Sequence, residues 1–95
     1  MYITLSETCW TILDILSLSK PMNSEKILEK LPRDVSKVRY RYSMRRLENA
    51  GLIKSCDALG SMHMKAYYLS TIDEINLNQF DNDLTKQVKE YLCVA

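Results

Sequence analysis

Apolar residues recur at helical spacing along most of the chain, and glycine and proline fall only where one apolar segment gives way to the next. The first segment is predicted to be a helix that begins near Thr4 or Ser6, because Thr4 and Glu7 have the spacing of a capping box. It should end before Pro21, since proline bars the preceding residue from helical geometry. Its broad apolar face predicts deep burial and comprises Cys9, Trp10, Ile12, Leu13, Ile15 and Leu16.

A second, short helix is predicted between Asn23 and Pro32. Asn23 is a favourable N-cap residue, and the apolar spacing continues over Ser24–Leu31. The residues expected to face inward are Ile27, Leu28 and Leu31.

The longest predicted helix covers about Val35–Asn49, with Asp34 as its cap. Gly51 follows its end at the position where a left-handed residue closes many helices. Leu52 then falls opposite Leu47, which is the apolar contact expected of a Schellman stop.

A β-hairpin is predicted after this helix. The pattern indicates a strand over 52–56, a turn over Asp57–Gly60 and a returning strand over 62–69. Thr71 and Glu74 then have capping-box spacing, so a helix is expected to restart there.

A last amphipathic helix is predicted over 83–92. Its apolar side consists of Leu84, Val88, Tyr91 and Leu92. Two placements are open: this side packs back on the first helix, or residues 83–93 form the contact of a homodimer.

Ninety-five residues with 46% apolar and 26% charged content indicate one folded domain over 1–95, with a core over 4–70 and a helical extension over 71–95. An α+β fold that is mainly α is therefore expected. No apolar run approaches the length of a membrane span and the N-terminus lacks a basic signal start, so we expect a cytoplasmic protein with no membrane partner.

Three scattered cysteines, Cys9, Cys56 and Cys93, do not suggest a disulfide framework, and we expect reduced, mostly buried thiols. None forms a close pair of the C-x-x-C type, so neither a metal site nor any cofactor is expected. The sequence also lacks a nucleotide-binding loop, a nucleophile elbow and a paired-carboxylate motif, which argues against an enzyme.

The net charge of +1 conceals an uneven distribution. Residues 33–46 hold six cations against one acid, whereas residues 71–95 hold two lysines against five acids. Asp34 and Glu48 are too few to neutralise the basic segment, so a merely solvated face is the less favoured interpretation. Such asymmetry orients a protein on an anionic partner.

On a helical wheel, the helix over 35–49 has one apolar stripe and one basic face. The inward stripe is Tyr40, Met44 and Leu47. The outward face is Val38, Arg39, Arg41, Tyr42, Arg45 and Arg46. Arg41 and Arg45 are four residues apart and destabilise each other by roughly 0.2 to 0.5 kcal/mol, a cost that a polyanionic partner removes.

The chemistry of this outward face suits a DNA duplex. Guanidinium groups can bind guanine O6 and N7 or a phosphate, Tyr42 can donate to a phosphate, and Val38 can meet a thymine methyl group. Residues near the start of the helix are expected to read bases, and Arg45 or Arg46 to hold the DNA backbone.

The order of these elements resembles the winged helix-turn-helix family of bacterial, archaeal and phage regulators. The resemblance covers about residues 5–70, and it is strongest over Met44–Ile53, where the basic helix meets the hairpin. The hairpin closes in Tyr67-Tyr68-Leu69-Ser70. The resemblance implies that the helix over 35–49 enters the major groove and that the hairpin over 53–69 is the wing.

The resulting candidate DNA-binding residues are Ser36, Lys37, Val38, Arg39, Arg41, Tyr42, Arg45, Arg46, Lys54, His63 and Lys65. The predicted wing loop has an acid and no arginine, which disfavours insertion into a minor groove. His63 has a weaker claim than the helix residues, although its titration near neutral pH would modulate binding.

The expected function is sequence-specific binding of double-stranded DNA by a small transcriptional regulator of phage or plasmid type, acting without enzymatic activity. The alternative is a winged-helix module whose basic helix binds an acidic protein surface.

Overall fold

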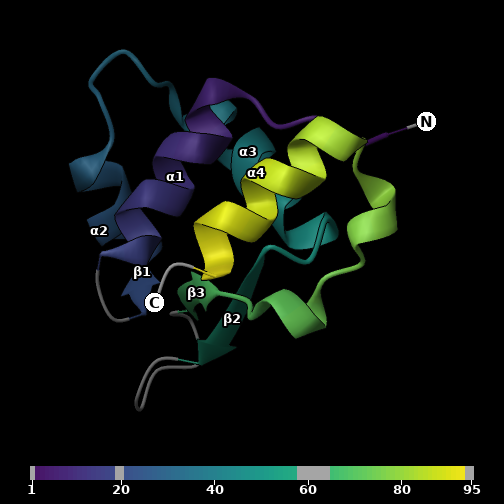
Figure 1. The fold of residues 1–95 in the computed structure, drawn as a ribbon. Helices are drawn as coiled ribbons and strands as arrows, with labels where there is room; N and C mark the ends of the chain where they lie inside the picture. The colour runs from purple at the N-terminus through teal and green to yellow at the C-terminus, as the bar shows by residue number, and fades with distance from the viewer. Residues whose placement is uncertain (1, 19–20, 58–64, 94–95) are drawn as a thin grey trace.

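Helices and a small antiparallel sheet make up the part of the chain that the computed structural model describes, which is residues 2–18, 21–57 and 65–93 (Figure 1). Along the chain the elements are α1 (Glu7–Ser17), β1 (Met22–Asn23), α2 (Ser24–Lys30), α3 (Lys37–Asn49), β2 (Ile53–Asp57), β3 (Lys65–Leu69), the 3₁₀ helices η1 (Ile72–Glu74) and η2 (Leu77–Gln79), and α4 (Asn82–Cys93). The fold is therefore α+β and mainly helical, as the sequence predicts.

The N-cap of α1 differs from the predicted capping box. The hydroxyl of Ser6 accepts a hydrogen bond from the backbone of Cys9 over 3.3 Å, so the helix begins at Glu7. Thr4 does not cap the helix, because its carbonyl and hydroxyl accept hydrogen bonds from Arg46 of α3 instead. Asn23 caps α2 as predicted, with its side chain accepting a backbone hydrogen bond 2.9 Å long.

The cap of α3 also corrects the sequence-based prediction. Asp34 lies in a turn in which the backbone of Val35 donates to the carbonyl of Pro32 over 3.1 Å. The cap is Ser36, whose hydroxyl accepts from the backbone of Arg39 over 3.1 Å. The helix therefore starts two residues later than predicted, because the turn after proline occupies the residues before Ser36.

The predicted Schellman stop at the end of α3 is confirmed. Gly51 has a positive φ of 76°, and its backbone donates to the carbonyl of Glu48 over 3.0 Å. The backbone of Leu52 donates to the carbonyl of Leu47, also over 3.0 Å, and both leucine side chains are buried. The stop turns the chain directly into β2.

The sheet has three strands in the order β1-β3-β2, and all neighbours are antiparallel. The sequence pattern predicts only the hairpin of β2 and β3. It does not reveal β1, because this strand is two residues long and shows no periodicity. Met22 pairs with Tyr67, while Ile53 pairs with Leu69. β2 starts one residue later than predicted and includes Asp57. The rest of the predicted turn and the start of the returning strand lie in 58–64, outside the described residues.

The segment after the sheet forms less helix than the sequence predicts. The Glu74 carboxylate accepts from the backbone and the hydroxyl of Thr71, over 3.0 and 2.9 Å, as the capping-box spacing indicates. However, only η1 forms at this point, and a second 3₁₀ turn, η2, follows it. The last predicted helix is confirmed as α4, which starts one residue earlier than expected.

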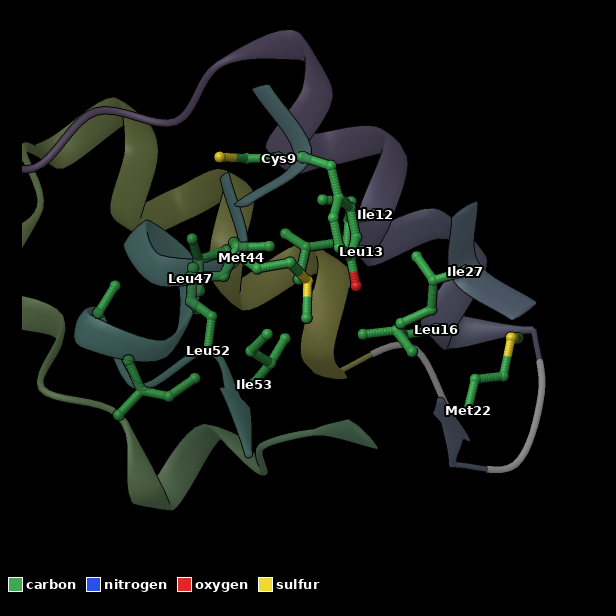
Figure 2. Packing of buried hydrophobic residues seen from close by; sticks show 14 of the residues in the cluster. Cys9, Ile12, Leu13, Leu16, Met22, Ile27, Met44, Leu47, Leu52 and Ile53 are labelled. Carbon is green, nitrogen blue, oxygen red and sulfur yellow. The ribbon is translucent and has the colours of Figure 1, made fainter. Parts of the chain in front are cut away.

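The core lies between α1, α3 and the start of β2. In Figure 2, the side chain of Leu13 on α1 extends toward Met44 of α3. Leu52 and Ile53 complete this layer, and all of them are buried. Because the inward side of α3 is fixed against α1, its opposite side is held outward.

The apolar side of α4 packs back on α1, which is one of the two placements open from the sequence. Val88 belongs to the buried core, and the rings of Trp10 and Tyr91 lie 5.6 Å apart between centroids. The hydroxyl of Tyr91 donates to the carboxylate of Asp14. Burial, and then this hydrogen bond, raise the pKa of Tyr91 to about 12. Within the described residues, no helix is long and apolar enough to cross a lipid bilayer.

Candidate nucleic-acid interface

The predicted division of α3 into an inward and an outward side is confirmed. Tyr40, Met44 and Leu47 are buried, and Ser43 joins them, which the apolar pattern does not reveal. Opposite them, Val38 and Tyr42 are 62% and 71% exposed. The arginines on the exposed part of α3 are Arg39, Arg41, Arg45 and Arg46. Large side chains of both kinds are therefore exposed on the side of α3 that faces away from the core.

The first turn of α3 is positively charged, although the N-terminus of a helix favours negative charge. The positive end of the helix dipole favours acids in the first turn, and α1, α2 and α4 follow this rule with Glu7, Glu25 and Asp83. The first turn of α3 has no acid and carries Lys37 and Arg39 instead. An anion bound beside α3 would offset both the dipole and the repulsion among its cations.

One edge of α3 carries a row of cations. Lys37, Arg41 and Arg45 recur every four residues, about 6 Å apart along the helix axis. They border a groove of about 540 Å³ between α3, α2 and β3. The other residues that line it are Ser24, Leu28, Tyr40, Met44, Glu48, Asn49 and Tyr67. The groove thus places three cations opposite the hydroxyl-bearing residues of α2 and β3.

Tyr40, one of the two tyrosines that line this groove, joins two helices. The hydroxyl of Tyr40 donates to the hydroxyl of Ser24 over 2.9 Å, which connects α3 to the first turn of α2. Burial is the main cause that raises the pKa of Tyr40 above its ordinary value of 10.0. The phenol therefore remains neutral at physiological pH, and Tyr40 serves to position α3.

The centre of the exposed side is a second, smaller hollow. Val38, Arg41, Tyr42 and Arg45 line a pocket of about 230 Å³ on the surface of α3. Two of its side chains are apolar or aromatic and two are guanidinium groups. Arg41 and Arg45 therefore belong both to the cationic row and to this central pocket.

The other edge of α3 is less positive. Arg39 lines a hollow of about 280 Å³ together with the acids Glu7 and Asp34. Arg46 donates to the backbone carbonyl of Thr4 over 2.9 Å and to its hydroxyl over 3.2 Å. The sequence pattern places four arginines on one face. In the structure, Arg41 and Arg45 lie on one edge of α3, and Arg39 and Arg46 lie on the other.

The remaining predicted site residues have different surroundings. The Ser36 hydroxyl caps α3, and Lys54 on β2 forms an ion pair with Glu74. Lys65 is exposed at the start of β3, where its register partner is Asp57. His63 lies outside the described residues. The hollows described above, all of them lined by described residues, do not include Lys54 or Lys65.

The sequence pattern does not identify the residues outside α3 that line the large groove. Ser24 and Tyr67 belong to α2 and β3, and only the tertiary fold brings them to α3. A signal for Ser24 is available in principle, since it follows a recognisable N-cap residue. Tyr67 has no comparable signal, because its position depends on the pairing with β1.

The cysteines follow the prediction in part. Cys9 is buried, and its thiol lies 3.9 Å from the carbonyl of Ser43, to which it donates across α1 and α3. Cys56 is exposed on β2, which corrects the expectation of burial. The side chain of Cys93 lies outside the described part. In the residues that the structure describes, no group of three or more His, Cys, Asp or Glu side chains is arranged to hold a metal ion.

The geometry of α3 offers hydrogen-bond donors and positive charge on both edges, with an apolar centre between them. Such a surface can hold two rows of anions while it contacts a less polar strip between them. No protein-family model matches the chain, and no curated protein matches it. Its function is therefore inferred from this geometry.

Proposed function

We propose that this chain binds double-stranded DNA in a sequence-specific manner, as a transcriptional regulator of winged helix-turn-helix type without enzymatic activity. The observation that carries the proposal is the exposed side of α3, where cations border both edges of a strip formed by Val38 and Tyr42. An α-helix fits the major groove of B-DNA, whose floor presents base edges between two phosphate backbones. We propose that the cations on the two edges of α3 contact the two phosphate backbones, and that Val38 and Tyr42 contact the base edges between them.

The architecture supports the same assignment. α2 and α3 are joined by a short turn, and β2 and β3 form a hairpin directly after α3. In a winged helix-turn-helix protein, these elements are the helix-turn-helix and the wing. We assign α3 as the recognition helix and the hairpin as the wing.

For Arg39 and Arg45 the proposed roles differ from those inferred from the sequence, whereas Arg41 and Arg46 keep theirs. Arg41 and Arg45 line the central pocket, so they are proposed to reach guanine O6 and N7. Arg39 and Arg46 lie on the other edge, where they are proposed to hold phosphates. Lys37 is proposed to hold phosphates of the opposite strand, from the large groove.

A dimer formed through the apolar side of α4 does not follow from this geometry, because that side packs within the protein. We therefore propose that one copy of the chain presents one recognition helix. Recovered binding sites are then expected to contain single rather than paired motifs.

Selection from a random-sequence duplex pool at low salt tests the proposal directly. We expect the full chain to enrich a defined motif, and its affinity to fall steeply with rising salt as counterions are released from the DNA. Absence of duplex binding at low salt would contradict DNA binding. It would favour the alternative in which α3 binds an acidic protein surface.

A further inference from the structure

Two exposed side chains give the centre of α3 an apolar character that phosphate binding does not explain. Val38 and Tyr42 are four residues apart, so they are neighbours on the helix surface. They account for two of the four exposed large hydrophobic side chains in the described part of the chain, the others being Tyr2 and Leu18. Cations alone would suffice to hold a DNA backbone.

The two arginines beside Val38 and Tyr42 place a second requirement on any ligand of this pocket. Arg41 and Arg45 line the same pocket as Val38 and Tyr42. Their guanidinium groups repel each other unless paired acceptors lie close by. A matching ligand therefore presents an apolar group and a pair of hydrogen-bond acceptors side by side.

In the major groove, this combination occurs where a 5-methylpyrimidine lies next to a guanine. The methyl group of thymine is the apolar feature of that groove, and guanine O6 and N7 are a pair of acceptors for arginine. 5-Methylcytosine carries its methyl group at the same ring position as thymine. The two bases therefore share the chemistry that the pocket requires.

We infer that the central pocket of α3 reads a 5-methylpyrimidine beside a guanine, with Val38 and Tyr42 against the methyl group and Arg41 or Arg45 on the guanine. The inference rests on the proposed function, because it requires α3 to lie in the major groove. It makes Val38 a specificity-determining residue that carries no charge.

Exchange of thymine for deoxyuracil tests the inference, because it removes only the methyl group. The probes are duplexes recovered from the random pool, each with one thymine replaced in turn. For thymines next to a guanine, we expect the full chain to lose about fourfold in affinity, which corresponds to one buried methyl group. Val38→Ala should still bind, but its thymine-to-uracil affinity ratio at that position should fall to about one.

Leu18→Ala is the matched control, because Leu18 is 86% exposed at the end of α1 and lies outside the pocket. Its thymine-to-uracil ratio should equal that of the unchanged chain. A second arm compares duplexes with cytosine or 5-methylcytosine in place of the sensitive thymine. Tighter binding of the methylated duplex supports recognition of the methyl group on either pyrimidine. A methyl effect with thymine alone also supports the pocket and assigns thymine as its source.

Two negative results have separate meanings. Sequence-specific binding with a ratio of one at every thymine, or with a ratio unchanged in Val38→Ala, would overturn this inference and leave DNA binding intact. Failure to bind any duplex at low salt would overturn the proposed function itself.

Discussion

The backbone N–H of Leu52 donates to the carbonyl of Leu47 over 3.0 Å, and both leucine side chains are buried in the core. Gly51 lies between them with a φ of 76°. This stop anchors the end of α3 at the point where β2 begins. It therefore fixes the direction in which the arginines of α3 project.

Replacement of Gly51 by alanine should lower the free energy of unfolding by about 1 to 2 kcal/mol, because a Cβ atom disfavours the left-handed conformation. An added Cβ would lie 4.0 Å from the carbonyl oxygen of Glu74, so steric clash does not contribute. Gly51→Asn should lose less, since asparagine tolerates positive φ. Chemical denaturation of both variants measures the difference, and equal losses would contradict this explanation.

Leu47→Ala should destabilise the fold by about 2 to 5 kcal/mol, because it removes a fully buried side chain between α1 and α3. Val38→Ala on the opposite side of the same helix is the control and should change stability by less than about 0.5 kcal/mol. Thermal or urea unfolding measures both values. Similar values for the two variants would show that α3 is oriented differently.

Tyr91→Phe should lower stability at neutral pH by about 1 kcal/mol, since it removes the hydrogen bond to Asp14 while keeping the aromatic ring against Trp10. Folding raises the pKa of Tyr91 from 10.0 to about 12, so the folded state favours the neutral phenol. The stabilisation is complete below pH 10 and is lost as the pH rises toward 12.

The difference in unfolding free energy between the unchanged chain and Tyr91→Phe should therefore shrink between pH 10 and 12. Tyr2→Phe is the control, because Tyr2 is exposed near the N-terminus. That change should leave stability at neutral pH nearly unaltered. A Tyr91 difference that stays constant over the alkaline range would contradict the raised pKa of Tyr91, and with it the burial and the hydrogen bond to Asp14 that raise it.

Local signals explain why the helices and the end of α3 could be predicted from the sequence. Asn23, Gly51 and the Leu47–Leu52 pair act within a few residues of their own positions, so spacing alone reveals them. The cap of α3 could not be predicted, because Asp34 and Ser36 are both suitable N-cap residues and the turn after Pro32 decides between them.

The candidate site could be predicted from the sequence only as a helix face. Helical phase correctly separates Tyr40 and Met44 from Val38 and Tyr42, because it depends on sequence spacing. The difference between the two edges depends on what lies beside them. Thr4 binds Arg46 on one edge, whereas Ser24 and Tyr67 face the cationic row on the other, and both relationships arise from long-range packing.

Arg46→Ala should have two effects that Arg45→Ala does not share. It removes two hydrogen bonds to Thr4, which should destabilise the fold by about 1 kcal/mol, and it should weaken binding of all duplexes alike. Arg45→Ala should leave stability nearly unchanged and relax base preference at one position, at a cost of about 1 to 3 kcal/mol for the selected site. Unfolding and duplex titrations measure both, and reversed behaviour would refute the assignment of the two edges.

The affinity of two double variants for the selected duplex tests the central claim most directly. Arg41→Ala with Arg45→Ala removes two cations from α3, whereas Lys86→Ala with Lys89→Ala removes two exposed cations from α4, so net charge falls equally. We predict that the α3 variant loses about tenfold or more in affinity while the α4 variant binds nearly as the unchanged chain does. Equal affinities of the two variants, or no binding of the unchanged chain to any duplex at low salt, would contradict recognition of DNA by α3.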